Sequence, residues 1–221
     1  MLKNKKIFYI IVTLTISLML FLYLGFFRYI CLYFIPLDNY INNYKNVKTN
    51  KKIGRTIISI KSNKEDIQKL EPVLKSLLDQ SVRIDAIYIN IHDKIEIPDF
   101  IKKIAIVNVT GKDYGDSQNF LPMLLREESS DTNIICLSND MIYDYNLIED
   151  LTSKVDKDPY KIICIDDKDY KKGMLIKPKF FDTEIMLNKN SNINQCINNN
   201  IKKTGIKTLK IKNKHNYKLL K

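Results

Sequence analysis

Residues 134–143 read Ile-Ile-Cys-Leu-Ser-Asn-Asp-Met-Ile-Tyr, a short apolar run that ends abruptly in three polar residues. A buried strand of a parallel sheet reads as a continuous apolar run, and ligands of open α/β sheets bind outside the carboxyl ends of such strands. A carboxylate at that edge, here Asp140, is well placed to hold a divalent cation against a phosphate, because hard cations prefer oxygen ligands. The alternative is an Asn-Asp turn that only ends a strand, since both side chains hydrogen-bond their own backbone in turns.

Upstream of this run, the sequence predicts a strand-helix-strand unit. Residues 55–61 are rich in β-branched side chains, and residues 84–91 alternate, so both predict strands. Apolar residues at helical spacing lie between them, after Ser62 and Asn63, either of which can cap a helix. Pro72 must kink this helix or begin its second part. A crossover of this kind implies parallel strands, so we expect an α/β fold with a mostly parallel sheet.

The rest of the chain continues this alternation of strands and helices. Further strands are predicted at residues 104–109, 133–137, 161–165, 173–177 and 206–211, and helices at residues 120–126, 145–155 and 192–203. Gly205 is expected to end the last of these helices, because glycine readily adopts the left-handed conformation of a C-cap. We therefore expect one folded domain over residues 53–212, followed by a basic tail at residues 213–221.

An uncharged run at residues 7–27 precedes the domain and follows three lysines. At about 1.5 Å per residue it is long enough to span a bilayer core of about 30 Å. It shows no small-residue cleavage pattern, so we expect a retained transmembrane anchor within residues 1–28 rather than a cleaved signal. The positive-inside rule then predicts a single-pass protein, with a cytoplasmic N-terminus and the C-terminal domain on the opposite side. Residues 29–52 are expected to form a stem or linker.

The 221-residue chain carries a formal net charge of +11, from 36 Lys plus Arg against 25 Asp plus Glu. Basic proteins can bind nucleic acid or anionic lipid. Lysine is spread over the whole chain, however, with no Arg-rich cluster and no basic stripe interleaved with aromatic residues, so we expect no nucleic-acid partner. Contact of the lysine-rich tail with anionic lipid or polymer is kept as an alternative. The 4 Cys and 2 His show no spacing typical of zinc.

Four sequence blocks share their order and spacing with a known family. In chain order they are Leu-Glu-Pro-Val-Leu-Lys-Ser-Leu-Leu-Asp-Gln (residues 70–80) with Asp-Ala-Ile-Tyr-Ile-Asn-Ile (residues 85–91), Asp-Tyr-Gly (residues 113–115), Ser-Asn-Asp-Met-Ile-Tyr (residues 138–143) and Gly-Met-Leu-Ile-Lys-Pro-Lys-Phe-Phe-Asp (residues 173–182). Together they resemble the small GT-A-fold, family-2-like glycosyltransferases, which use a nucleotide-sugar and a divalent metal. The resemblance covers residues 59–205.

This resemblance implies a GT-A-like (Rossmann-like), mostly parallel sheet flanked by helices. It implies that the protein transfers a sugar from a nucleotide-sugar donor to a glycan or protein acceptor. The nucleotide-sugar would be bound by Lys61 and Ser62, at a strand end, together with Asp113, Tyr114 and Gly115. The residues do not specify the donor sugar, the acceptor or the stereochemistry of transfer.

The resemblance further implies a Mn²⁺ or Mg²⁺ ion held by Asp140 with the help of Asn139. The family has carboxylates where this chain has Ser138 and Asn139, and a lysine where Asn119 stands. Its later acidic motif, which supplies the catalytic base, should fall near residues 193–196, where this chain has no acid. Loss of a general base typically costs about 10² to 10⁴ in rate. A second hypothesis is therefore a catalytically inactive glycosyltransferase-like module for binding or scaffolding, tethered to a membrane.

Overall fold

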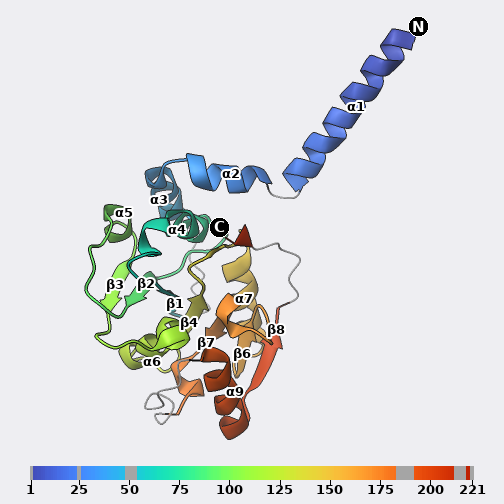
Figure 1. The fold of residues 1–221 in the computed structure, drawn as a ribbon. Helices are drawn as coiled ribbons and strands as arrows, with labels where there is room; N and C mark the ends of the chain where they lie inside the picture. Colours follow the sequence, from blue (N-terminus) through green and yellow to red (C-terminus); the bar gives the residue numbers. More distant parts are fainter. Residues whose placement is uncertain (1, 24–25, 48–53, 183–191, 212–217, 220–221) are drawn as a thin grey trace. The chain divides into compact units, whose positions relative to one another are not determined.

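A computed structural model of the chain describes residues 2–23, 26–47, 54–182, 192–211 and 218–219 (Figure 1). The chain divides into two compact units, Met1–Pro36 and Leu37–Lys221. The first unit contains the helices α1 (Leu2–Tyr23) and α2 (Phe26–Phe34). The second unit contains the sheet and the remaining helices. The predicted basic tail at residues 213–221 lies mostly outside the described residues.

The helices of the first unit contradict the prediction of a transmembrane anchor. The uncharged run at residues 7–27 is shared between α1, which ends at Tyr23, and α2, which begins at Phe26. Because α1 starts at Leu2, it also includes three lysines, so its apolar part is shorter than the run suggested. In the described part of the chain, no helix has both the length and the apolar composition that crossing a bilayer requires. The prediction of a single-pass membrane protein is therefore wrong.

The segment expected as a stem contains helix α3 (Leu37–Lys45), which belongs to the second unit. The hydroxyl of Tyr44 accepts a hydrogen bond from the backbone nitrogen of Ile84 at 2.9 Å and donates one to its carbonyl oxygen at 3.0 Å. Burial raises the pKa of Tyr44 to about 12, so the hydroxyl remains a donor over the physiological range. These two hydrogen bonds fix α3 to the residues that lead into the second strand.

The second unit is an α/β fold built on a seven-stranded sheet in the order β3-β2-β1-β4-β7-β6-β8. The strands are β1 (Thr56–Lys61), β2 (Ala86–Ile91), β3 (Ile106–Val109), β4 (Asn133–Leu137), β6 (Lys161–Cys164), β7 (Gly173–Ile176) and β8 (Lys207–Lys210). Strands β3, β2, β1 and β4 pair in parallel, as do β6 and β8, whereas β7 runs antiparallel to β4 and to β6. The predicted mostly parallel α/β sheet is confirmed. A smaller antiparallel sheet joins β5 (Met141–Ile142) to β9 (Lys218–Leu219).

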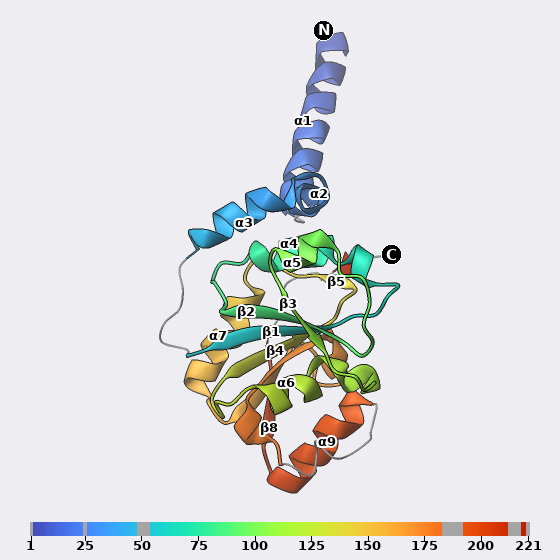
Figure 2. The ribbon, with the colours of Figure 1, turned by 90° about the vertical axis from the view of Figure 1, so that its left-hand side faces the viewer.

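Helices cover both faces of this sheet. They are α4 (Glu71–Leu78), α5 (Asp99–Lys102), α6 (Leu121–Arg126), α7 (Leu147–Lys157) and α9 (Ile193–Thr204), with the 3-10 helices η1 (Ile67–Lys69), η2 (Gly115–Asn119), η3 (Tyr170–Lys172) and η4 (Pro178–Phe180). Figure 2 shows α4 and α5 over one face of the sheet and α6 over the other. Pro72 stands in the first turn of α4, where its missing N–H is not needed, so it begins the helix rather than kinking it.

The core accounts for the continuous apolar runs in the sequence. Every residue of β4 is buried, as expected for a strand covered on both faces. On one face, Ile57 of β1 and Ile134 of β4 belong to a single apolar cluster with Phe120 and with Ile197 of α9. Each such side chain, once fully buried, stabilises the fold by about 1.5–3 kcal/mol.

The sheet also determines which residues meet at its carboxyl edge. Leu137, the last residue of β4, pairs with Gly173, the first residue of β7, because these two strands are antiparallel. Residues that follow β1 and β4 therefore lie beside residues that precede β7. Gly173 has a φ of 148°, and a Cβ added there would lie 2.5 Å from Ile165 Cδ1 and 3.1 Å from Leu137 Cδ2.

Replacing Gly173 with alanine is expected to lower the free energy of unfolding by about 1–3 kcal/mol, because the added methyl group overpacks the contact with Ile165. Urea unfolding followed by circular dichroism measures this change. Gly111→Ala is the matched control, since Gly111 also has a positive φ, of 64°, but nothing lies within 4 Å of an added Cβ. Equal destabilisation by the two variants would contradict the packing argument.

Replacing Tyr44 with phenylalanine is expected to lower the free energy of unfolding by about 1–3 kcal/mol, because it leaves a backbone donor and acceptor of buried Ile84 without their partner. The same unfolding measurement applies. Tyr145, whose side chain is 47% exposed, provides the control as Tyr145→Phe. If both substitutions were neutral, α3 would not be held in the way described.

Candidate functional site

A cavity of about 680 Å³ lies at the carboxyl edge of the parallel strands. Its walls come from the residues that end or follow β1, β2 and β4, from η2, and from η3. The volume falls within the range of about 300–1,000 Å³ that small-molecule sites occupy. Of the seven residues that the sequence predicted for the site, the structure places six in these walls: Lys61, Ser62, Asp113, Gly115, Asn139 and Asp140.

Tyr114 is the predicted residue that does not line this cavity. Its side chain packs against the apolar cluster of the core, and the ammonium of Lys112 lies 4.8 Å from its ring centroid. Its backbone nitrogen donates a hydrogen bond to Gln118 Oε1 at 2.9 Å. Tyr114 therefore holds η2 on the core rather than facing a ligand.

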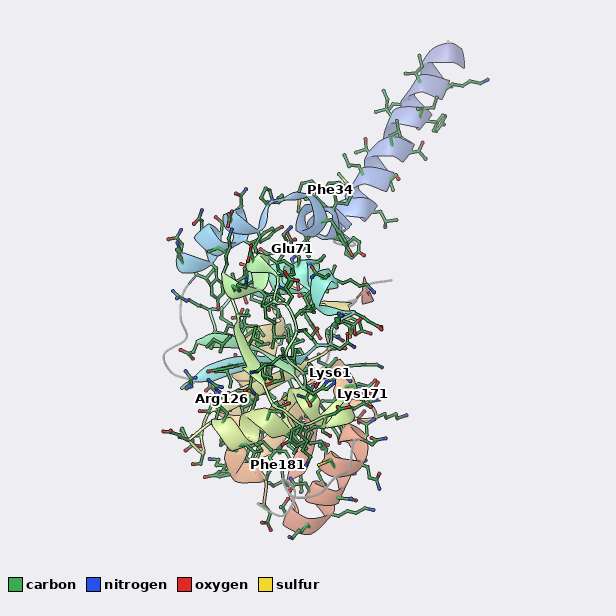
Figure 3. All side chains as sticks on the ribbon, turned by 60° about the vertical axis from the view of Figure 1, so that its left-hand side comes forward. Phe34, Lys61, Glu71, Arg126, Lys171 and Phe181 are labelled. Atoms are coloured by element: carbon green, nitrogen blue, oxygen red, sulfur yellow. The ribbon has the colours of Figure 1, made fainter. Side chains whose placement is uncertain are left out.

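Two lysines and one carboxylate form the centre of one wall. Lys61, the last residue of β1, places its Nζ 2.7 Å from Asp116 Oδ1, and Lys171, in η3, places its Nζ 2.5 Å from Asp116 Oδ2. Figure 3 shows Lys61 and Lys171 side by side. Burial alone would raise the pKa of Asp116, but the hydrogen bonds from Lys171 and Lys61 outweigh it and hold that pKa below its usual value.

Buried hydrogen bonds tie η2 to the centre of the sheet. Ser59, fully buried in β1, donates from its hydroxyl to the carbonyl oxygen of Asn119. The same hydroxyl accepts a hydrogen bond from Asn90 Nδ2 at 2.8 Å. At the other end of η2, Asp113 Oδ1 accepts a hydrogen bond from the backbone nitrogen of Gly115 at 2.7 Å. The side chain of Asp116 therefore projects from a segment whose carboxyl end is held on the sheet by Ser59.

A second wall, which we call the acidic wall, carries Asp66 and the motif that follows β4. Asn139 Nδ2 donates to Asp66 Oδ2 at 3.2 Å, and the hydroxyl of Ser138 donates to Asp140 Oδ1. The hydroxyl of the fully buried Tyr143 donates to the carbonyl oxygen of Ser138 at 2.9 Å, which anchors the turn. The cavity thus has the paired charges of Lys61, Lys171 and Asp116 in one part of its lining, and the carboxylates of Asp66 and Asp140 in another.

The donor set of the acidic wall does not fit a divalent-cation site built by the protein alone. Hard cations such as Mg²⁺ take about six oxygen ligands. Asp140 and Asn139, the predicted ligands, already hydrogen-bond Ser138 and Asp66. Across the residues that the structure describes, no group of three or more His, Cys, Asp or Glu could hold a metal ion.

The position expected for a catalytic base has a structural role instead. Asn194 Oδ1 accepts a hydrogen bond from the backbone nitrogen of Tyr170 at 2.9 Å, and its Nδ2 donates to Asp169 Oδ1 at 3.5 Å. Asn194 thereby supports η3, the segment that carries Lys171. Asp166, two residues after the end of β6, accepts from Lys172 Nζ at 2.7 Å and, mainly because of this hydrogen bond, has a pKa lowered to about 2, so it is a poor base.

The sequence did not predict several residues that line the cavity, namely Asn63, Asp66, His92, Asp116, Lys171 and Asn192. Lys171 is distant in sequence from every predicted site residue. In the sequence, Lys171 is marked only by its place just before a predicted strand. The apolar residues of that strand do not show that it runs antiparallel to its neighbours. His92 lies beside Asp93, with Nε2 2.8 Å from Asp93 Oδ2.

In comparisons with known proteins, no family model matches the chain, and no curated protein matches it. The function must therefore be inferred from the chemistry of the cavity and from the resemblance of the four sequence blocks.

The pKa of Asp116 is expected to lie below the ordinary value of 3.8 and to rise in Lys171→Met. Because the pKa of Asp116 is lower in the folded state, its ion pairs with Lys61 and Lys171 stabilise the fold at pH values above the ordinary pKa. This contribution is lost as the pH falls through the lowered pKa of the folded state. The pKa of Asp116 is measured from its carboxyl ¹³C chemical shift over a pH titration. Lys172→Met serves as control, since the ammonium of Lys172 pairs with Asp166 instead. An unchanged titration in Lys171→Met would show that the Asp116–Lys171 pair does not form.

Proposed function

We propose that this chain is a glycosyltransferase-like protein that binds a nucleotide-sugar donor in the cavity and transfers the sugar to an acceptor. One observation carries the proposal. Residues from three separate stretches of sequence converge on one cavity, namely Lys61 and Ser62, Asp113 and Gly115, and Asn139 and Asp140. The resemblance to family-2-like glycosyltransferases associates the first two pairs with the donor and the third with its metal ion.

The polarity of the cavity supports this assignment. A nucleotide-sugar has an anionic diphosphate and a sugar rich in neutral hydroxyl donors. We assign the nucleotide end to the wall of Lys61, Ser62 and Asp113, and the sugar to the wall of Asn139 and Asp140. A carboxylate such as Asp140 accepts hydrogen bonds from hydroxyl groups, and charge-assisted hydrogen bonds are the stronger ones.

A second candidate function is binding of the donor without transfer. Transfer to an acceptor hydroxyl forms a bond from that oxygen to the anomeric carbon, releases a nucleoside diphosphate, and needs a group that takes the hydroxyl proton. Asn194, at the position where the family's base is expected, has an amide that cannot accept this proton and that is committed to η3. This observation favours a module that recognises a nucleotide-sugar and does not turn it over.

Thermal unfolding of the full chain with UDP, GDP, ADP and TDP and their glucose conjugates tests donor binding. A ligand at about 100 times its dissociation constant stabilises the fold by about 2.7 kcal/mol, which raises Tm by a few degrees for a domain of this size. We expect Asp140→Ala to weaken stabilisation by the sugar conjugate more than by the free diphosphate. Asp156→Ala, which removes an exposed carboxylate of α7 outside the cavity, is the control.

Release of nucleoside diphosphate from the bound conjugate then separates the two candidates. Turnover that disappears in Asp140→Ala supports transfer, whereas binding without release supports the binding module. If no nucleotide or conjugate shifts Tm, both candidates are wrong.

A further inference from the structure

We propose that Lys61 and Lys171 together bind the diphosphate of the ligand and neutralise it without a divalent cation. The inference rests on the proposed function, because it identifies which part of a nucleotide-sugar the two lysines hold. Two observations lead to it. The acidic wall lacks a complete set of ligands for a cation, and elsewhere in the same cavity the ammonium groups of Lys61 and Lys171 meet at Asp116.

The two lysines are arranged to donate to more than one acceptor. Their ammonium groups contact different oxygens of the same carboxylate, Asp116, at 2.7 and 2.5 Å. An ammonium has three N–H donors, so each lysine retains donors beyond the one directed at Asp116. The side chains of Lys61 and Lys171 are 35% and 46% exposed, and both line the cavity, so a ligand can reach them. Neighbouring phosphates of a diphosphate offer several oxygens to such a pair.

Lys171 supplies the cavity with a second cation beside Lys61. The family-like loop has Asn119 at the position of the family's lysine, and Asn119 is uncharged. Lys171 reaches the same cavity from η3, on the far side of Asp116 from Lys61. The positive charge is therefore restored by a residue distant in sequence.

Asp116 has a defined role in this arrangement. In the free protein it holds both ammonium groups at one position and prevents their mutual repulsion. It also competes with the ligand, because a phosphate oxygen must replace a carboxylate oxygen on each lysine. Removing the carboxylate should therefore tighten binding of a diphosphate, whereas removing either lysine should weaken it.

Asn119 adds a buried, uncharged acceptor to the residues of the cavity. The residue is only 3% exposed, and its Oδ1 has no hydrogen-bond partner among the described residues. Leaving such an acceptor unpaired costs about 1–3 kcal/mol. A nucleoside diphosphate or its sugar conjugate brings N–H and O–H donors on its base and sugar, so it has more groups to pair in the cavity than inorganic diphosphate has.

Isothermal titration of the full chain with UDP, GDP, ADP, TDP and inorganic diphosphate, each in EDTA and in Mn²⁺, tests the inference. At least one nucleoside diphosphate is expected to bind in EDTA as tightly as in Mn²⁺ and more tightly than inorganic diphosphate. Lys61→Met and Lys171→Met should each weaken it by about 10- to 100-fold. Asp116→Asn should tighten it.

The controls separate the site from general charge and from folding. Lys172→Met removes the adjacent lysine of η3, which is 47% exposed but pairs with Asp166, and should leave affinity unchanged. Lys171→Arg keeps the charge and should retain most of the binding. Thermal unfolding of each variant without ligand shows whether the fold is intact.

Three results would overturn the inference. Binding that requires Mn²⁺ and is equally affected by Lys171→Met and Lys172→Met would overturn the role of the lysines and leave the proposed donor site standing. Weaker binding in Asp116→Asn would show that the carboxylate belongs to the ligand site rather than competing with it. Failure of every nucleotide to bind in either condition would overturn both this inference and the proposed function.

Discussion

The geometry of the cavity depends on one buried hydroxyl. Ser59 is buried within β1, and its hydroxyl bonds Asn90 of the neighbouring strand β2 and the backbone of Asn119. A buried polar group without partners is costly, so this arrangement is stable only while all three groups are in place. The hydroxyl thus fixes η2 over the end of β1. Asp116 in η2 and Lys61 at the end of β1 consequently meet at a defined distance.

The two walls of the cavity are built by different means. The lysine wall is assembled from distant segments by ion pairs, and it leaves ammonium donors accessible. The acidic wall is a local turn, in which Ser138 and Asn139 hydrogen-bond the neighbouring carboxylates of Asp140 and Asp66. Amide and hydroxyl groups at these two positions reduce the charge that a cation would require, while they keep the turn ordered.

Much of the fold could be predicted from the sequence, and the reasons are physical. Burial on both faces requires the apolar run at residues 134–137, and the left-handed cap after α9 requires Gly205, whose φ is 71°. Six of the seven residues predicted for the site line the cavity, because residues after parallel strands share one edge. Two features of the structure could not be predicted from the sequence. The end of α1 at Tyr23 and the start of α2 at Phe26 have no charge or proline to mark them, and Lys171 reaches the cavity only through the order and direction of β7.

The antiparallel strand has a consequence for how this site can change. Because β7 runs against its neighbours, its amino end lies at the edge where the parallel strands have their carboxyl ends. The short connection between β6 and β7 therefore contributes directly to the cavity, although it belongs to the later half of the chain. Insertions or substitutions in that connection can alter the charge of one wall while the segments after β1 and β4 keep their sequence. Ligand preference and the framework that supports it are thus encoded in separable parts of the chain.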